Sequence, residues 1–224
     1  VAENPSLLSL MGLVGLTSTG TNSVSIYGNN SLNNLTGLNN VTTIGDGLYI
    51  TESPSLLSLT GLQNIISIGS GLTIRANSAL TSLSGLEGIT SIGGLYLGNN
   101  TSLVNLTGLE SLTSIGEGGL SIYNNDSLRN LAGLDNLTTI GGTLSIESNY
   151  RLNSLSALKN LTSIGYGLSL RGVIDLNNLT GLDNINANTI SWLSISNNVN
   201  LLSCDVKSVC DYLISPSGWT DWDA

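Results

Sequence analysis

The chain of 224 residues contains no histidine, no phenylalanine and few charged side chains. Histidine is the usual general base and the commonest metal ligand, so its absence argues against most nucleophilic and metal-dependent catalysis. Only 6 basic residues accompany 15 acidic ones, for a net charge of −9, which argues against a surface that follows phosphates. We therefore expect a protein that is not an enzyme, uses no metal or other cofactor, and has no nucleic-acid partner.

Long apolar runs are also missing. No run approaches the ~20 residues that a membrane-spanning helix needs, so we expect no membrane insertion. The sequence opens at Val1 without a basic stretch followed by an apolar one, the pattern of a signal peptide. We expect a monomeric module, taken from a longer chain.

Cysteine is scarce too, since the only two are Cys204 and Cys210 near the C-terminus. In an oxidising compartment they could form a short disulfide clamp. The alternative is a pair of reduced thiols.

What is present is a repeat of 23 to 25 residues. Each unit opens on a leucine, and the opening leucines are Leu7, Leu32, Leu56, Leu80, Leu103, Leu128, Leu152, Leu176 and Leu201. A second apolar residue follows three positions later, and then a Gly-Leu pair such as Gly108-Leu109, broken only at Ala157. A repeat of this length predicts an elongated array with one continuous core.

The remainder of each unit predicts short strands. A segment such as Val41-Thr-Thr-Ile44-Gly45 leads into an alternating piece such as Leu48-Tyr-Ile-Thr51, and alternation marks a strand with one buried face. Recurring glycines leave no room for a helix of ten residues, and we expect them to supply positive φ at the corners. The sequence therefore predicts a mainly β fold, a parallel β-solenoid of about eight turns over residues 1–201.

A column of asparagines lies three residues before the opening leucines. It comprises Asn4, Asn29, Asn77, Asn100, Asn125, Asn149 and Asn198, with Ser53 and Val173 as exceptions. Asparagine tolerates bends and satisfies backbone groups there. We predict an internal hydrogen-bonded ladder with a structural role.

The pattern stops after Leu201, and residues 202–224 are predicted to form a C-terminal cap. A helix over about 205–214 would place Val206, Val209, Cys210 and Leu213 on one stripe. An open solenoid exposes apolar layers, which such a helix would cover. The tail after Pro216 carries two tryptophans that we expect to lie over the same end.

Segments such as Gly108-Leu-Glu-Ser-Leu-Thr-Ser-Ile-Gly-Glu-Gly-Gly-Leu-Ser-Ile-Tyr-Asn-Asn-Asp-Ser-Leu128 resemble the receptor L-domain family of leucine-rich repeats. The Gly-Leu, Leu-Thr-x-Ile-Gly, Leu-x-Ile and Asn-x-x-Leu elements recur in the same order through residues 4–201. The ending, Leu202-Ser-Cys-Asp-Val-Lys-Ser-Val-Cys-Asp-Tyr-Leu213, is similar to that of arrays in secreted Bacteroidetes-type surface proteins. The resemblance implies a right-handed solenoid, secretion or display at the cell surface, and recognition through the broad sheet. The cysteine-rich and kinase parts of the receptors have no counterpart here, so growth-factor signalling does not carry over.

The alternating strand presents two outward columns. The first, which we call the Tyr49 column, reads Ser25, Tyr49, Thr73, Tyr96, Ser121, Ser145, Ser169 and Ser194. The second, which we call the Arg75 column, reads Tyr27, Thr51, Arg75, Gly98, Tyr123, Glu147, Arg171 and Ser196. We predict that this face binds a ligand through Tyr27, Tyr49, Thr73, Arg75, Tyr96, Tyr123, Glu147 and Arg171, because tyrosine offers a large amphipathic surface. The alternative is that exposed strands simply favour Tyr, Thr and Ser.

Charged residues on these columns do not converge. Glu147 and Arg171 are one rung apart and are expected to pair, while Arg75 lies about four rungs, or roughly 19 Å, from Arg171. Asp46 and Glu117 are single carboxylates on different turns, which is too few for a calcium site.

A second outward surface is the Thr/Ser file. Its residues are Thr42, Thr43, Thr90, Ser91, Thr113, Ser114, Thr138, Thr139, Thr162 and Ser163. Because the apolar residues on either side point inward, both residues between them are expected to face solvent at regular spacing. A flat, uncharged array of hydroxyl and methyl groups suits ice, whereas the alternative is an ordinary solvated strand.

These surfaces give three hypotheses for function. The first is an extracellular recognition or adhesion module that binds a protein or glycan through the sheet. The second is an ice-binding protein that uses the Thr/Ser file. The third is a structural spacer within a larger surface protein.

Overall fold

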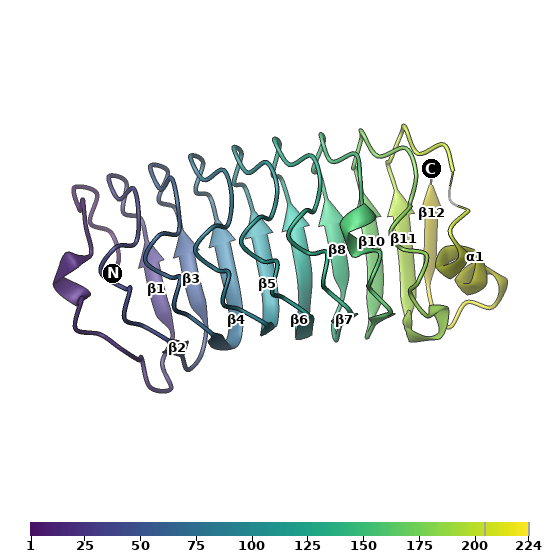
Figure 1. The fold of residues 1–224 in the computed structure, drawn as a ribbon. Helices are drawn as coiled ribbons and strands as arrows, with labels where there is room; N and C mark the ends of the chain where they lie inside the picture. Colours follow the sequence, from purple (N-terminus) through teal and green to yellow (C-terminus); the bar gives the residue numbers. More distant parts are fainter. Residues whose placement is uncertain (204, 224) are drawn as a thin grey trace.

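A computed structural model describes residues 1–203 and 205–223. The turns stack side by side along one axis, so that the chain advances turn by turn from its N-terminal turn to β11 (Figure 1). The architecture is a β-solenoid of parallel strands with about eight turns and one short C-terminal helix, as the repeat predicts.

One parallel sheet runs the length of the array. Its strands, in spatial and chain order, are β1 (Val24–Tyr27), β3 (Leu48–Thr51), β4 (Ser67–Arg75), β5 (Ser91–Gly98), β6 (Ser114–Tyr123), β8 (Leu144–Glu147), β10 (Gly167–Arg171), β11 (Trp192–Ser196) and β12 (Thr220–Asp223). Short strands β2 (Thr43–Ile44), β7 (Thr139–Ile140) and β9 (Ser163–Ile164) pair with their neighbours in the same sheet, before the corner that leads into the longer strands. Three 3₁₀ turns complete the array, η1 (Met11–Leu13), η2 (Ser156–Leu158) and η3 (Ala187–Thr189).

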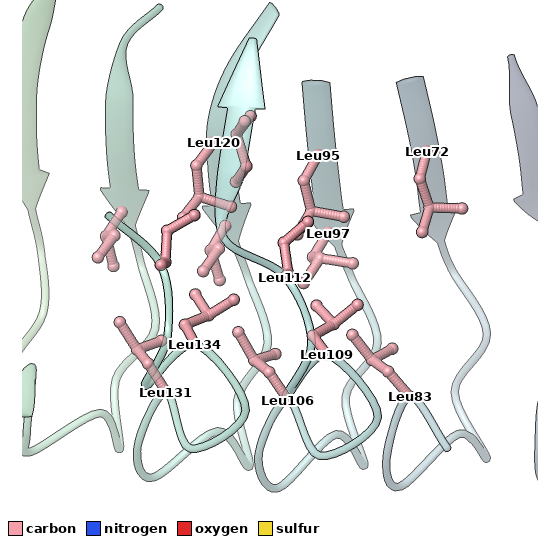
Figure 2. Packing of buried hydrophobic residues seen from close by; sticks show 14 of the residues in the cluster. Leu72, Leu83, Leu95, Leu97, Leu106, Leu109, Leu112, Leu120, Leu131 and Leu134 are labelled. Carbon is pink, nitrogen blue, oxygen red and sulfur yellow. The ribbon is translucent and has the colours of Figure 1, made fainter. Parts of the chain in front are cut away.

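The core consists of leucine and isoleucine columns that run along the solenoid axis. Figure 2 shows Leu72, Leu95 and Leu120, which lie on consecutive strands β4, β5 and β6 and share one register. Leu83, Leu106 and Leu131 form another column on the bends, and all of these side chains are almost fully buried. A fully buried leucine contributes about 1.5–3 kcal/mol relative to an exposed one. Each turn therefore derives its stability from the turns before and after it.

The two recurring glycine columns have different causes. Gly108 represents the Gly-Leu column and has φ of 111°, so it supplies the predicted positive φ. Gly165 represents the glycine after each buried isoleucine, and it does not have a positive φ. A Cβ on Gly165 would lie 2.0 Å from the carbonyl oxygen of Gly141 on the preceding turn. This second column is glycine because the backbones approach closely, which corrects the prediction of positive φ for every corner glycine.

The interruption at Ala157 has a local solution. Ala157 does not adopt the positive φ of Gly133 and Gly181, its counterparts on the neighbouring turns. Instead it lies within η2, a 3₁₀ turn in which the backbone N–H of Lys159 donates to the carbonyl of Ser156. The chain thus replaces a glycine-dependent bend by a helical bend, and Ala157 remains buried in the core.

The asparagine column forms the predicted ladder. Asn100 is fully buried, and its side-chain oxygen accepts a hydrogen bond from the backbone N–H of Asn77 at 3.1 Å. Its side-chain amide donates to the carbonyl of Ile74 at 2.9 Å. The same arrangement continues with Asn125, whose oxygen accepts from the backbone N–H of Asn100 at 3.0 Å. Each asparagine therefore joins its own turn to the preceding one through buried polar groups.

Two exceptions show what the column requires. Ser53 still contributes, because its hydroxyl accepts from the backbone N–H of Asn29 at 3.4 Å. The side chain of Val173 has no acceptor for the backbone N–H of Asn149. The backbone N–H of Val173 itself donates to the side-chain oxygen of Asn198 at 2.9 Å. The ladder therefore continues through Ser53 and is interrupted at Val173.

Replacement of Asn100 by alanine should strongly destabilise the array. The change leaves the N–H of Asn77 and the carbonyl of Ile74 buried without their partner, and each such group costs about 1–3 kcal/mol. We expect urea unfolding to show a loss of more than about 2 kcal/mol, while the exposed control Asn30→Ala stays within about 0.5 kcal/mol of wild type. An equal effect of the two variants would contradict a structural role for the ladder.

The C-terminal end is covered by α1 (Lys207–Ile214). The predicted helix is present, but the buried residues are Val209, Tyr212 and the preceding Val206, whereas Cys210 is exposed and Leu213 is 40% exposed. The stripe differs because Tyr212 packs its ring inward and its hydroxyl donates to the carbonyl of Trp219 at 3.4 Å. None of the helices in the described residues is long and apolar enough to cross a membrane.

The tail does more than lie over the end of the array. After α1 the chain returns as β12, which pairs in parallel with β11 and extends the sheet by one strand. The predicted disulfide between Cys204 and Cys210 cannot be placed, because Cys204 lies outside the described residues.

Candidate functional site

The strand register confirms the alignment of both predicted columns, but three serines at their C-terminal end, Ser169, Ser194 and Ser196, are buried rather than exposed. Tyr49 pairs with Ser25 and Thr73, and Thr73 pairs with Tyr96. The Arg75 column is likewise continuous from Tyr27 on β1 to Ser196 on β11. Parallel strands with one rung per turn therefore place these side chains side by side on the outer face.

A third outward position, which sequence inspection missed, lies one residue before the first buried leucine of each strand. It is occupied by Gly47, Gly71, Gly94, Gly119, Thr143 and Gly167, and we call this position the glycine lane. Beyond Gly167 the lane is occupied by Trp192, its register partner. Because glycine has no side chain, an aromatic ring can lie directly over the backbone at this position. Gly47, Gly94, Gly119 and Gly167 are buried, whereas Gly71 and Thr143 are half-buried.

A groove with a volume of about 530 Å³ crosses the lane between two tyrosines. Tyr49 and Tyr96 line it, and they lie on strands two rungs apart, with Thr73 between them. Gly71 and Gly94 complete the floor. The backbones of the two tyrosines are therefore separated by roughly 10 Å along the axis, with the Thr73 hydroxyl and the glycine backbone between them.

Both tyrosines lie over glycines of the lane. A Cβ on Gly47 would lie 2.7 Å from the ring of Tyr49, and one on Gly94 would lie 3.1 Å from the ring of Tyr96. The Tyr96 hydroxyl donates to the carbonyl of Gly118 at 2.7 Å, yet the residue remains 38% exposed. Tyr96 is therefore held in one orientation and still presents surface to a ligand.

The rest of the groove comes from the corner within β4 and β6, where the register shifts before the alternating residues begin. Ser70 and Glu117 line it, and neither was among the predicted site residues. The Ser70 hydroxyl donates to Asp46 at 2.5 Å, and the Ser23 hydroxyl donates to the other oxygen of the same carboxylate at 2.7 Å. These two hydrogen bonds, that from Ser70 first, lower the pKa of Asp46. Asp46 thus connects three consecutive turns and fixes the position of Ser70.

The other predicted residues of the sheet lie outside the groove. Arg75 lies next to Thr73 on the neighbouring column, while Tyr123, Glu147 and Arg171 lie on later rungs. At the N-terminal end, Tyr27 lies beside the Glu52 carboxylate, which raises the pKa of the phenol. The groove therefore unites Tyr49, Thr73 and Tyr96 and leaves the rest dispersed along the face.

The expected pairing of Glu147 with Arg171 is wrong. The Glu147 carboxylate accepts hydrogen bonds from Ser145 at 2.9 Å and from Ser169 at 3.5 Å. Within the part of the chain that the structure describes, the one ion pair is Lys207–Asp211 on α1. Ser145, on the same strand, and Ser169, on the next rung, therefore bind the Glu147 carboxylate in place of Arg171.

A separate hollow lies between η3 and α1. Its polar lining includes Asp183 and the Lys207–Asp211 pair. It is part of the junction between the array and its cap, and none of the predicted site residues line it.

The Thr/Ser file is exposed in part: none of its ten residues is buried, but Thr43, Ser114, Thr139 and Ser163 are half-buried, whereas the other six are exposed. Backbone hydrogen bonds join Thr90, Thr113, Thr138 and Thr162 rung by rung. The hydroxyls of the last three donate to the carbonyl of the preceding threonine at 2.9–3.1 Å. These bonds fix the hydroxyl positions, so the methyl groups of successive threonines have equivalent orientations. Ile66 interrupts the file at its N-terminal end and is 60% exposed.

An aromatic cluster, also missed in the sequence, occupies the C-terminal end of the glycine lane. The ring of Trp192 lies edge-to-face with Tyr166 at 6.4 Å and tilted against Trp219 at 5.9 Å. Tyr166 and Trp219 are 59% and 61% exposed. The large exposed fraction distinguishes this cluster from the buried core.

Comparisons with known proteins add no assignment: no family model matches the chain, and no curated protein matches it.

Loss of the Ser70 hydroxyl should raise the pKa of Asp46 towards its ordinary value. The ionised carboxyl is favoured in the folded state, so its contribution to stability is present above the ordinary pKa and is lost as the pH falls through the lowered one. We expect NMR titration of the Asp46 carboxyl to show an upward shift in Ser70→Ala, a smaller one in Ser23→Ala, and none in the exposed control Ser55→Ala. An unchanged midpoint in Ser70→Ala would show that the Ser70 hydrogen bond is not the main cause.

Proposed function

We propose that this chain is an extracellular, non-catalytic recognition or adhesion module that binds a protein or glycan through the outer face of its sheet. The groove between Tyr49 and Tyr96 is the observation that carries the proposal. It combines two amphipathic rings with the hydroxyl groups of Thr73 and Ser70 on a rigid floor of paired strands. Such a combination of an apolar surface and a few placed polar groups is typical of binding sites.

The rigidity of the groove supports the proposal. Binding is less costly when the contacting side chains are ordered beforehand. Tyr96 is tied to Gly118, and Ser70 is tied to Asp46. The resemblance to receptor L-domains points to the same face, because that family recognises ligands through its sheet.

Replacement of both Tyr49 and Tyr96 by alanine should weaken recognition strongly. We expect a glycan array and a pull-down from extracellular material to show a loss of about tenfold or more, which corresponds to ~1.4 kcal/mol of aromatic contact. Tyr123→Ala, on the same face but outside the groove, should have a smaller effect.

The matched control for this experiment is Tyr150→Ala. Tyr150 is 48% exposed but lies outside the sheet and the groove. Binding that survives in the double variant as well as in the control would refute the assigned face.

A second candidate function is ice binding through the Thr/Ser file. The specific observation is the fixed hydroxyl orientation at Thr113, Thr138 and Thr162, which makes the array of methyl groups regular. The ten residues of the file carry no charge. A regular, uncharged surface favours contact with an ordered layer of water over contact with a charged partner.

Thermal hysteresis measures ice binding directly. If the file binds ice, the wild type should show hysteresis, and Thr138→Tyr should lose most of it because a phenol ring disrupts the flat array. Ser121→Tyr, a change of the same kind on the sheet face, should retain it. Absence of hysteresis in the wild type would end this candidate, and a chain that also binds no partner would function as a spacer.

A further inference from the structure

The groove and the aromatic cluster lie on the same lane. Gly71 and Gly94 form the floor of the groove, and the register continues from Gly94 through Gly119 and Thr143 to Gly167, whose partner is Trp192. Tyr96 on β5 and Trp192 on β11 are four rungs apart in the sheet order. At the usual strand spacing this separation is roughly 19 Å along the solenoid axis.

Trp192 is oriented towards the lane. A Cβ on Gly167 would lie 2.0 Å from the indole ring, so the ring covers the lane at that rung. Trp192 is the first residue of β11, and Trp219 immediately precedes β12. Because Leu193 pairs with Thr220, the two tryptophans lie at the same position on successive strands. The lane therefore has exposed aromatic rings towards both ends and small residues between them.

A peptide partner is disfavoured on this surface. Peptides commonly add to a sheet as an extra strand, which requires an unpaired edge. The strands under the lane are paired on both sides and run across it. An occupant that lies along the axis must instead contact ring faces, hydroxyls and carbonyls.

The charges along the lane disfavour an anionic occupant. Glu117 lines the groove, and Asp221 on β12 accepts a hydrogen bond from Ser194 at 3.4 Å. Arg75, Glu147 and Arg171 lie on the outer Arg75 column, two positions beyond the Tyr49 column. The net charge of the chain is −9, so a polyanion would be repelled.

We propose that the cluster of Tyr166, Trp192 and Trp219 is a second subsite for the same ligand, and that the glycine lane holds one neutral polysaccharide chain along the solenoid axis. Pyranose rings present C–H groups that pack on aromatic faces, while their hydroxyls bond to the polar groups between the rings. The inference rests on the proposed function of the groove, and it narrows the ligand class to an extended, uncharged glycan.

Native affinity electrophoresis tests the inference. Gels would contain hydroxyethyl-cellulose, a β-1,3-glucan or a galactomannan, and carboxymethyl-cellulose would serve as the anionic counterpart of the first. We expect at least one neutral polymer to retard the wild type, and the anionic counterpart to retard it less. Trp219→Ala, Tyr166→Ala and the double variant of Tyr49 and Tyr96 should each weaken retardation about five- to tenfold, whereas Tyr150→Ala should not.

Tryptophan fluorescence gives an independent readout. The three tryptophans are Trp192, Trp219 and Trp222, which all belong to the C-terminal end. The polymer that retards the wild type should change the emission of these tryptophans. A disaccharide of the same sugar is too short to reach from the groove to the cluster and should change the emission much less at equal sugar concentration. Unchanged thermal unfolding of each variant by circular dichroism would show that the fold is intact.

The outcomes separate the two proposals. Suppose that retardation by a polymer depends on the two groove tyrosines but not on Trp219 or Tyr166, and that the polymer leaves the tryptophan emission unchanged. This result would overturn the second subsite alone. If retardation depends on the aromatic cluster but not on the two tyrosines, both the proposed binding along the lane and the proposed role of the groove would be overturned. Failure of every neutral polymer to retard the wild type would overturn this inference, while binding of a protein through Tyr49 and Tyr96 would still support the proposed function.

Discussion

The hydrogen bond from a backbone N–H to the asparagine side chain of the next turn keeps the turns of this protein in register. Asn77, Asn100, Asn125 and Asn149 repeat it deep inside the molecule, where an unpaired polar group is costly. A slip of one residue would break these bonds and move the leucine columns out of alignment. The outer columns inherit that register, because each outward side chain lies at a constant distance along the chain from a buried one.

The sequence alone therefore predicted the parts of the molecule that repeat. The Tyr49 column and the Arg75 column follow from alternation with buried positions such as Leu48 and Ile50, and the strand pairing reproduces both columns. The exposure of the Thr/Ser file follows in the same way from the apolar residues on either side of it. Periodicity is a strong signal because the same pattern of buried and outward residues recurs in every turn.

Features that depend on a single turn could not be predicted, and neither could the return of the tail as a strand after its predicted helix. Glu147 bonds to serines rather than to Arg171, and that choice depends on side-chain geometry and not on spacing. The recurring glycines of the lane predict only corners in the chain, because a glycine pattern does not show which aromatic rings lie over those glycines. β12 has no repeat signature, so the alignment of Trp219 with Trp192 emerged only from the strand pairing.

The corner between the isoleucine column and the glycine lane differs in length from turn to turn. Two residues separate Ile68 from Gly71, whereas one separates Ile92 from Gly94, and three separate Ile115 from Gly119. The pairing absorbs these differences as local register shifts, and the core columns on either side remain aligned. Because this corner supplies Ser70 and Glu117 to the groove, insertions here would alter specificity without disturbing folding. The scaffold can therefore diversify its ligands during evolution much as an antibody does through its hypervariable loops.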